Sequence, residues 1–295
     1  MFGLYFGHYL VEKNKISQSQ FEDVMLQFQK SRAKLGFIAV TEKLLTAKQA
    51  DEINDLQKKT DKRFGDIAIE KGYLLNEEVT YLLNMQGNSY LRFLQLLAEN
   101  MILSIEEIEG VLKEFQQELS LSDSDLDDLK SGDIDRIIPV FLDIDNSLYR
   151  ECISLTIRNI VRFINSNIII KKSYIVNNYS FRSLVSQKLA GTPGLFIGLA
   201  GRDTALLSVA NPFAREEFQF LNEDAFDSVC EFINCSNGIY ASKLSQEDIL
   251  LEMAPPEYHT DKSIISEGDI YIVPFLINGE QADIIVTMDN RIGIH

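Results

Sequence analysis

Histidine and cysteine are scarce in this chain of 295 residues, which has three of each and no tryptophan. The histidines are too few and too far apart for a His-based triad or a zinc site, since they stand at His8, His259 and His295. The sequence also contains no Walker loop, no G-x-G-x-x-G after a strand and no H-E-x-x-H. These absences predict that the protein has no metal site and no cofactor of its own.

The cysteines and the N-terminus bear on the cellular compartment. Cys152, Cys230 and Cys235 are odd in number and lack the spacing of zinc ligands, which favours reduced thiols in the cytosol. The first ten residues have neither the basic start nor the cleavage site of a signal peptide. No run of 18 apolar residues is present to cross a membrane. We therefore expect a cytoplasmic protein without membrane insertion.

Basic residues are fewer than acidic residues. The chain has 28 Lys and Arg against 44 Asp and Glu, a formal net charge of −16. Phosphate backbones and anionic lipid surfaces both require a dense basic surface, so nucleic acid and membrane are excluded as partners. The apolar content of 45% is ordinary for a globular protein, and the length favours two domains.

The first 116 residues repeat with a period of 29. Each unit starts at an apolar residue, has another apolar residue ten positions later, and then in three of four units has a residue type that caps helices. The starts are Phe6, Leu35, Phe64 and Phe93, and the cap positions are Ser17, Thr46, Leu75 and Ser104. Each unit is predicted to be two helices joined by a short turn, and such units must stack to bury their apolar stripes.

An acidic segment follows these units. Residues 121–145 contain eight Asp and no Glu. Asp and Ser compete with the helical backbone, so the pattern predicts a linker, with a solvated spacer favoured over an acidic docking strip. We place an all-α module at 1–118, the linker at 119–137 and a second domain at 138–295.

The second domain alternates helical and strand-like patterns. Helices are predicted over 148–164 and 222–244. One hairpin is predicted to turn at Gly201-Arg202-Asp203 and another at Asn278-Gly279, the second being a strong hairpin signal. The first hairpin would pair 194–199 with 204–209, and the second would pair 269–277 with 283–288. The fold class predicted for the chain is α+β, with a helical repeat module before a domain of two long helices and a mostly antiparallel sheet.

A polar line runs along the second long helix. At about 100° per residue, Asp227, Glu231, Asn234 and Gly238 share one face, opposite an apolar stripe. A glycine inside a helix costs about 1 kcal/mol relative to alanine. It therefore indicates that a surface approaches the helix closely, either the protein's own sheet or another molecule.

The order Glu231-x-x-Asn234, Gly238 and the Pro255-Pro256 turn resembles the chemotaxis phosphatase family of CheX, CheC and FliY. The strand-like segments on either side are similar to that family as well. Members of the CheC type carry the E-x-x-N pair on both long helices. The first helix here has Arg158 and Val161 and no such pair, so the resemblance is to the single-site CheX arrangement.

The resemblance implies a phosphatase that hydrolyses the aspartyl phosphate of a response-regulator receiver domain. The receiver supplies its own Mg²⁺ and lysine, so catalysis depends on positioning a water. Asn234 would orient that water and donate to the phosphoryl oxygens, and Glu231 would pair with the receiver's lysine. The resemblance also implies a homodimer. The alternative is an adaptor that binds a receiver without speeding hydrolysis.

The N-terminal units carry a second resemblance. The third unit reads Arg63-Phe64-Gly65-x-Ile67-Ala68-Ile69-x-x-Gly72, with Gln86 after it, and resembles the N-terminal repeats of the type II secretion ATPases GspE and MshE. Some domains with that repeat bind cyclic di-GMP, so an adaptor responsive to this nucleotide is a further alternative. Tyr5 stands where the first unit would need a cation, and Leu94 where the fourth would need glycine, which favours a scaffold or protein docking.

Overall fold

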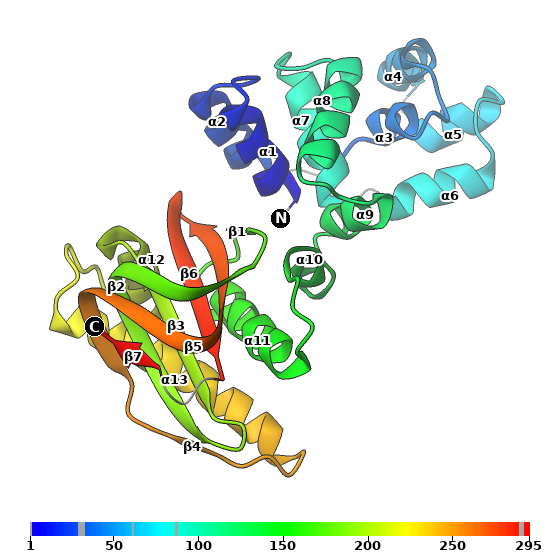
Figure 1. Ribbon diagram of the computed structural model, residues 1–295. Coiled ribbons are helices and arrows are strands. Elements are labelled where there is room, and N and C mark those ends of the chain that lie inside the picture. Colours follow the sequence, from blue (N-terminus) through cyan, green and yellow to red (C-terminus); the bar gives the residue numbers. More distant parts are fainter. Residues whose placement is uncertain (1, 29–32, 61, 86–87, 289–291) are drawn as a thin grey trace. The chain divides into compact units, whose positions relative to one another are not determined.

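The computed structural model describes residues 2–28, 33–60, 62–85, 88–288 and 292–295, and Gln86 lies outside these ranges. Helices and an antiparallel sheet make up the described chain, which confirms the α+β class. The chain divides into two compact units, Met1–Asp133 and Ile134–His295 (Figure 1). No helix among the described residues is long and apolar enough to cross a membrane.

The N-terminal unit begins with four helix–turn–helix pairs. Their helices are α1 (Phe2–Glu12), α2 (Gln18–Phe28), α3 (Leu35–Thr41), α4 (Ala47–Thr60), α5 (Phe64–Glu70), α6 (Asn76–Met85), α7 (Ser89–Glu99) and α8 (Ile105–Glu118). The predicted cap positions precede the second helix of each pair. At α8, Ser104 Oγ accepts from the Glu107 amide and the Glu107 carboxylate accepts from the Ser104 amide, a complete capping box.

The turn inside each pair has a residue in the left-handed conformation at the same position of the repeat. Asn14, Lys43, Gly72 and Met101, which are 29 positions apart, have φ angles of +54°, +60°, +68° and +54°. The amide of the next residue donates to the carbonyl five positions earlier, at 2.9 Å from Lys15 to Leu10 and at 2.9 Å from Tyr73 to Ala68. This is the closure of a Schellman motif. The backbone therefore repeats with the sequence period, although only one of the four turns has glycine at the left-handed position.

Exchanging the residue at two of these turns should change stability in opposite directions. Met101 is 94% exposed, so Met101→Gly removes backbone strain without removing packing, and it should raise the free energy of unfolding by about 0.5–1 kcal/mol. At Gly72, nothing lies within 4 Å of an added Cβ, so Gly72→Ala should lower it by about 1–2 kcal/mol through conformation alone. Urea denaturation followed by circular dichroism measures both, and a shift of equal sign would contradict the interpretation.

An aromatic cluster joins the first helix pair to the fourth. Phe115 on α8 is buried, and its ring centroid lies 5.6 Å from that of Phe6 and 5.1 Å from that of Tyr9, both on α1. The Tyr9 hydroxyl donates to Glu118 at 3.1 Å. The second and third pairs share a separate core with the start of α7, which includes the buried side chains of Ile38, Ile53, Ile67, Leu82 and Leu91.

The segment predicted as a linker is helical instead. Helix α9 spans Asp123–Ser131, and Ser122 and Asp125 form a capping box at its start. The prediction failed because acidic residues that disfavour a helix interior stabilise a helix N-terminus. Leu126 and Leu129 are buried, and α9 packs against α1 and α7. The acidic segment is thus part of the helical unit as far as Asp133, and the second unit starts with α10 (Ile134–Phe141).

The C-terminal unit packs helices against an antiparallel sheet. The helices after α10 are α11 (Ser147–Phe163), α12 (Asp203–Ala214) and α13 (Glu223–Ser245). The strands are β1 (Ile168–Ile170), β2 (Tyr174–Gly191), β3 (Leu195–Gly201), β4 (Leu251–Met253), β5 (Glu257–Ile277), β6 (Glu280–Thr287) and β7 (Gly293–Ile294). Both long helices were predicted to within one or two residues at each end.

Four strands of this sheet pair in a closed cycle. β2 pairs with β3, β3 with β6, β6 with β5, and β5 with β2. The predicted hairpin at Asn278-Gly279 is confirmed, because Ile277 pairs with Glu280 and both turn residues have positive φ, +52° and +80°. Helix α13 contacts β2, β4 and β5, so the long helix with the polar line lies over this sheet.

The first predicted hairpin is wrong. β3 ends at Gly201, and residues 204–209 belong to α12 rather than to a second strand. The buried residues of α12 are Ala205, Leu206, Val209 and Ala210. They recur at a spacing of four, as residues on one face of a helix do. A short apolar run fits a strand or a buried helix equally well, and the sequence pattern alone did not separate them.

Candidate functional site

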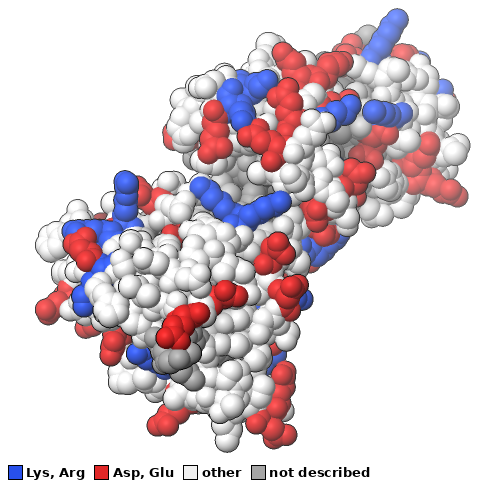
Figure 2. Space-filling model, viewed as in Figure 1, with Lys and Arg blue, Asp and Glu red and all other residues white. Residues whose placement is uncertain are grey.

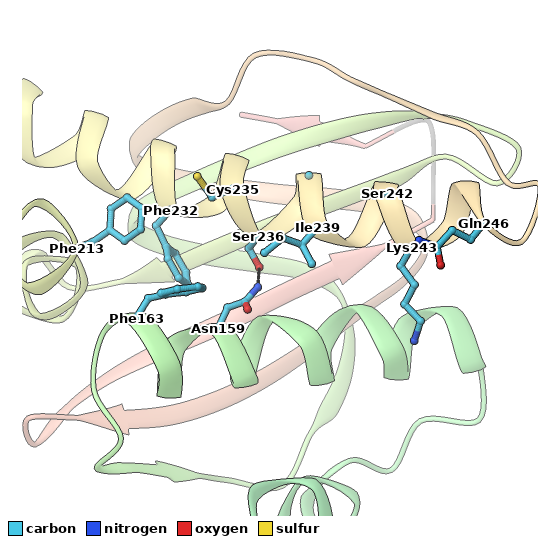
Figure 3. A pocket seen from close by; sticks show the side chains of 11 residues that line it. Asn159, Phe163, Phe213, Phe232, Cys235, Ser236, Ile239, Ser242, Lys243 and Gln246 are labelled. Carbon is cyan, nitrogen blue, oxygen red and sulfur yellow. Dashed lines mark hydrogen bonds between the residues drawn. The ribbon is translucent and has the colours of Figure 1, made fainter.

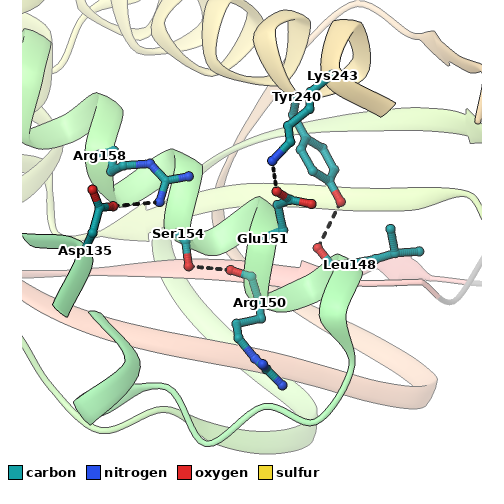
Figure 4. Close-up of polar contacts among 8 residues, drawn as sticks. All are labelled: Asp135, Leu148, Arg150, Glu151, Ser154, Arg158, Tyr240 and Lys243. Atoms are coloured by element: carbon teal, nitrogen blue, oxygen red, sulfur yellow. Dashed lines mark hydrogen bonds and ion pairs between the residues drawn. The ribbon is translucent and has the colours of Figure 1, made fainter. Parts of the chain in front are cut away.

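Helix α13 is fixed at both ends. At its start, Asn222 Oδ1 accepts from the Ala225 amide at 3.0 Å, and acidic residues occupy the first turn, where they suit the helix dipole. In its second half, the Tyr240 hydroxyl donates to the Leu148 carbonyl of α11 at 2.9 Å, and Lys243 forms an ion pair with Glu151 of α11 (Figure 4). The outward face of α13 is therefore held in one orientation.

The predicted polar line lies on that outward face. Asp227 and Glu231 are exposed, and Asn234 and Gly238 are half-buried. The apolar stripe of the helix is buried, as at Phe226, Val229 and Ile233. Glu231 accepts a hydrogen bond from the Cys235 thiol, with Sγ to Oε1 at 3.4 Å. The structure thus brings the two predicted site residues onto one accessible surface, one helical turn apart.

The amide of Asn234 belongs to a buried network that the sequence did not predict. Gln187 on β2 is 1% exposed and lies beneath α13. Its Nε2 donates to Asn234 Oδ1 at 2.9 Å and to the Ala254 carbonyl at 2.7 Å. Its Oε1 accepts from Asn237 Nδ2 at 2.9 Å. The only indication of this network in the sequence was the Pro255-Pro256 turn, because it directly follows Ala254.

Gly238 is not required by the protein's own packing. A Cβ built at Gly238 would meet only the Met253 side chain, at 3.9 Å from Sδ and 4.0 Å from Cε. These are ordinary van der Waals contacts, so alanine would fit within the chain. Of the two explanations for this glycine, close packing against the sheet is therefore wrong.

An apolar groove borders the polar line on the side of Gly238 (Figure 3). It has a volume of about 870 Å³ and lies between α11 and α13. Asn159 Nδ2 donates to Ser236 Oγ across the two helices at 2.9 Å. The other side chains that line the groove include Phe163, Phe213, Phe232, Ile239 and Gln246. The groove offers apolar contact area beside the polar residues of α13.

Thiol and metal chemistry have little support at this site. Partial burial, with the hydrogen bond to Glu231, raises the pKa of the Cys235 thiol, and burial raises the pKa of Cys230 to about 11. A nucleophilic cysteine needs a lowered pKa. The described residues contain no group of three or more His, Cys, Asp or Glu side chains that could hold a metal ion.

The first long helix carries no second acid–amide pair. Arg158 of α11 forms an ion pair with Asp135 of α10 at 3.1 Å and so ties these two helices together (Figure 4). Val161 follows where a second asparagine would stand. The polar line of α13 is therefore a single candidate site.

The first glycine of each of the first three N-terminal units is a packing position, whereas Gly72 in the third turn has nothing within 4 Å of an added Cβ. A Cβ at Gly7 would lie 2.2 Å from the Phe21 ring, one at Gly36 would lie 2.9 Å from the Phe64 ring, and one at Gly65 would lie 2.6 Å from Val79. Each of these three glycines is thus covered by the protein's own side chain rather than open to a phosphate. Two of the nearby cations are also engaged, since Lys34 pairs with Glu99 at 2.6 Å and Arg92 donates to the Gln27 carbonyl at 2.7 Å. These contacts favour a scaffold over a nucleotide site.

The basic side chains of the described residues are interspersed with acidic ones. On the face that Figure 2 shows, the Lys and Arg of the described residues occur in small groups among Asp and Glu. Several basic side chains are neutralised by neighbours, as in the ion pairs of Lys13 with Glu118 and of Lys71 with Glu52. A phosphate backbone would find no continuous basic surface on that face.

Comparison with solved structures identifies neighbours among chemotaxis proteins. A CheX from Desulfovibrio desulfuricans is 15% identical with a TM-score of 0.43, covering 48% of this chain and 99% of its own. A CheC-like superfamily protein from Shewanella sp. PV-4 is 18% identical with a TM-score of 0.43, covering 48% and 97%. The complex of CheX with CheY, BeF₃ and Mg²⁺ from Borrelia burgdorferi matches at 17% identity and a TM-score of 0.40, covering 48% and 97%. No family model and no curated protein matches the sequence.

Proposed function

We propose that the protein hydrolyses the aspartyl phosphate of a response-regulator receiver domain, with Glu231 and Asn234 as the residues that contact the receiver. The observation that carries the proposal is the outward face of α13. An exposed carboxylate, an amide held by a buried partner and a glycine with free space around it lie along one line of a fixed helix.

The chemistry needs little more than this arrangement. Hydrolysis of an acyl phosphate requires a water in line with phosphorus, and positioning with electrostatic stabilisation provides most of the rate enhancement. Asn234 provides an amide that orients the water and donates to phosphoryl oxygens. Glu231 provides a carboxylate for the lysine of the receiver. Mg²⁺ is expected on the receiver, as the resemblance to the chemotaxis phosphatases implies.

A phosphate-release assay tests the proposal. Receiver domains from the same genome are phosphorylated with acetyl phosphate and mixed with the full chain. The release of phosphate should exceed the receiver's own hydrolysis rate and should increase with the concentration of this protein. If no receiver is dephosphorylated faster than it is alone, the adaptor alternative replaces the phosphatase. The homodimer and the cytoplasmic location stay predictions from the sequence.

Gly238→Ala should separate stability from receiver binding. Because alanine favours helix and fits the site, the free energy of unfolding should rise by up to about 1 kcal/mol. The added methyl group should interfere with a closely docked receiver and weaken its affinity by about 1–3 kcal/mol, roughly 5- to 150-fold. Affinity is measured by calorimetry with receiver carrying beryllofluoride.

Gly110 on α8 provides the matched control. It is an exposed helical glycine with nothing within 4 Å of a built Cβ. Gly110→Ala should stabilise the N-terminal unit by a similar amount and leave receiver affinity unchanged. Equal receiver affinity for Gly238→Ala and the parent would show that α13 is not the docking face.

A further inference from the structure

We propose that Gln187 is a positioning residue that determines which end of the Asn234 amide faces the receiver. The inference rests on the proposed function and deepens it, because it assigns the outward atoms of Asn234 to a buried residue of another element. Gln187 lies on β2, where it pairs with Ile197 of β3, and its side chain points beneath α13. At 1% exposure it cannot touch a receiver itself.

One backbone carbonyl fixes the orientation of the whole network. The Ala254 oxygen can only accept a hydrogen bond, so the Gln187 atom 2.7 Å away must be the nitrogen. The same nitrogen lies 2.9 Å from the Asn234 side chain, and with its first hydrogen used it donates the second to Asn234 Oδ1. The remaining Gln187 oxygen then accepts from Asn237 Nδ2. Every hydrogen-bonding atom of this buried amide except one oxygen lone pair is engaged.

The Ala254 carbonyl is in turn held by its surroundings. The Ala254 amide donates to the Lys188 carbonyl at 2.9 Å, which joins it to the strand that carries Gln187. Pro255 and Pro256 follow, and neither has an N–H that could form a competing bond. The proline turn therefore contributes to the site through the Ala254 carbonyl, which accepts from Gln187. The Asn234 side chain also forms its hydrogen bond with Gln187.

The consequence for Asn234 is a fixed outward side. The torsion that exchanges the oxygen and nitrogen of an asparagine amide is broad and nearly two-fold, so without a partner either atom can face outward. With Oδ1 held by Gln187, Nδ2 points away from the sheet, and no described residue accepts from it. The receiver thus meets two N–H donors and one oxygen lone pair, a set that suits a phosphoryl oxygen together with a water.

Gln187→Glu in the full chain tests this role, with Gln95→Glu as the matched control. The introduced carboxyl has at most one hydrogen to donate, and the Ala254 carbonyl can only accept it. Its oxygens are then acceptors toward Asn234, so Asn234 should turn its Nδ2 inward and present oxygen to the receiver. We expect kcat for phosphate release to fall about tenfold or more, by analogy with lost partners behind metal ligands, while KM for the receiver stays near that of the parent. Gln95→Glu makes the same exchange at a buried amide of α7, where its Oε1 faces the Lys34 amide, and it should leave kcat unchanged.

Nuclear magnetic resonance of the Asn234 side chain gives a readout that does not depend on turnover. Its NH₂ signal is assigned by its loss in Asn234→Ala. In the parent these protons should exchange readily with water, and in Gln187→Glu their exchange should slow because they bond the buried carboxylate. If Gln187→Glu does not fold, Gln187→Met removes the donor at similar volume, and it should shift the Asn234 signal and lower kcat.

The outcomes separate the two proposals. An Asn234 signal that is the same in the parent and in the folded Gln187 variant overturns the positioning role, whatever the activity. A shifted signal with a parental kcat overturns it as well, because the orientation would then not matter for hydrolysis. A parent without phosphatase activity overturns the proposed function, while the signal still reports whether Gln187 orients Asn234.

Discussion

Asn234→Ala is expected to reduce receiver dephosphorylation by about 10²–10³, the loss of about 2.7–4 kcal/mol seen when a preorganised donor to a developing oxyanion is removed. Asn234 is half-buried on the outward face, and its side chain accepts a hydrogen bond from the buried Gln187. Truncation leaves one Gln187 hydrogen without an acceptor, so the free energy of unfolding should fall by about 1–3 kcal/mol while the chain still folds. It should lower kcat and leave the receiver affinity largely unchanged. Single-turnover phosphate release at saturating receiver measures the effect.

Glu231→Ala provides the comparison for that experiment. Glu231 is exposed, and its carboxylate accepts a hydrogen bond from the thiol of Cys235. Its removal should weaken receiver affinity as well as rate, and more at low salt, because the lost contact is a charge pair formed on encounter. If Asn234→Ala keeps the parental turnover, the line on α13 is a solvated face and the site has been misassigned.

Phe115→Ala is expected to lower the free energy of unfolding of the N-terminal unit by about 3–5 kcal/mol, the usual cost of removing a buried aromatic side chain. Phe115 is 1% exposed, and its ring contacts three aromatic residues of α1: Phe2, Phe6 and Tyr9. Truncation therefore leaves a cavity between the first and the fourth helix pair. Urea denaturation of the full chain should show an earlier transition for this unit.

Phe220→Ala is the control for the same measurement. Phe220 is 71% exposed, so its truncation should change the midpoint little. A parental midpoint for Phe115→Ala would mean that α1 and α8 do not share a core.

The sequence was most informative where a pattern is long and local. Helices α11 and α13 are 17 and 23 residues long, and their amphipathic patterns were long enough to predict them. The hairpin at Asn278-Gly279 was predicted from a residue pair that tolerates positive φ. The errors came from short segments. Residues 204–209 were too few to distinguish a strand from a buried helix, and the acidic residues of α9 were assigned to a spacer because their place at a helix start was not recognised.

The candidate site was likewise predicted only in its local part. The period of α13 alone was enough to place Glu231 and Asn234 on one outward face. Gln187 was missed because it is 47 residues from Asn234, on a part of β2 for which no strand had been predicted. Its partner depends on how a helix lies over a sheet, and one sequence does not contain that register.

The contact between the first and fourth helix pairs also affects the order in which the unit can fold. In an open solenoid each repeat contacts only its neighbours, so folding can spread along the chain as it is made. Here α1 needs Phe115 and Glu118, which are more than 100 residues away, as the separation of 109 between Tyr9 and Glu118 shows. Contacts of such long range slow folding, because the intervening chain must be ordered first. The helices made first therefore complete their core last, and a nascent chain that ends before α8 exposes the aromatic face of α1.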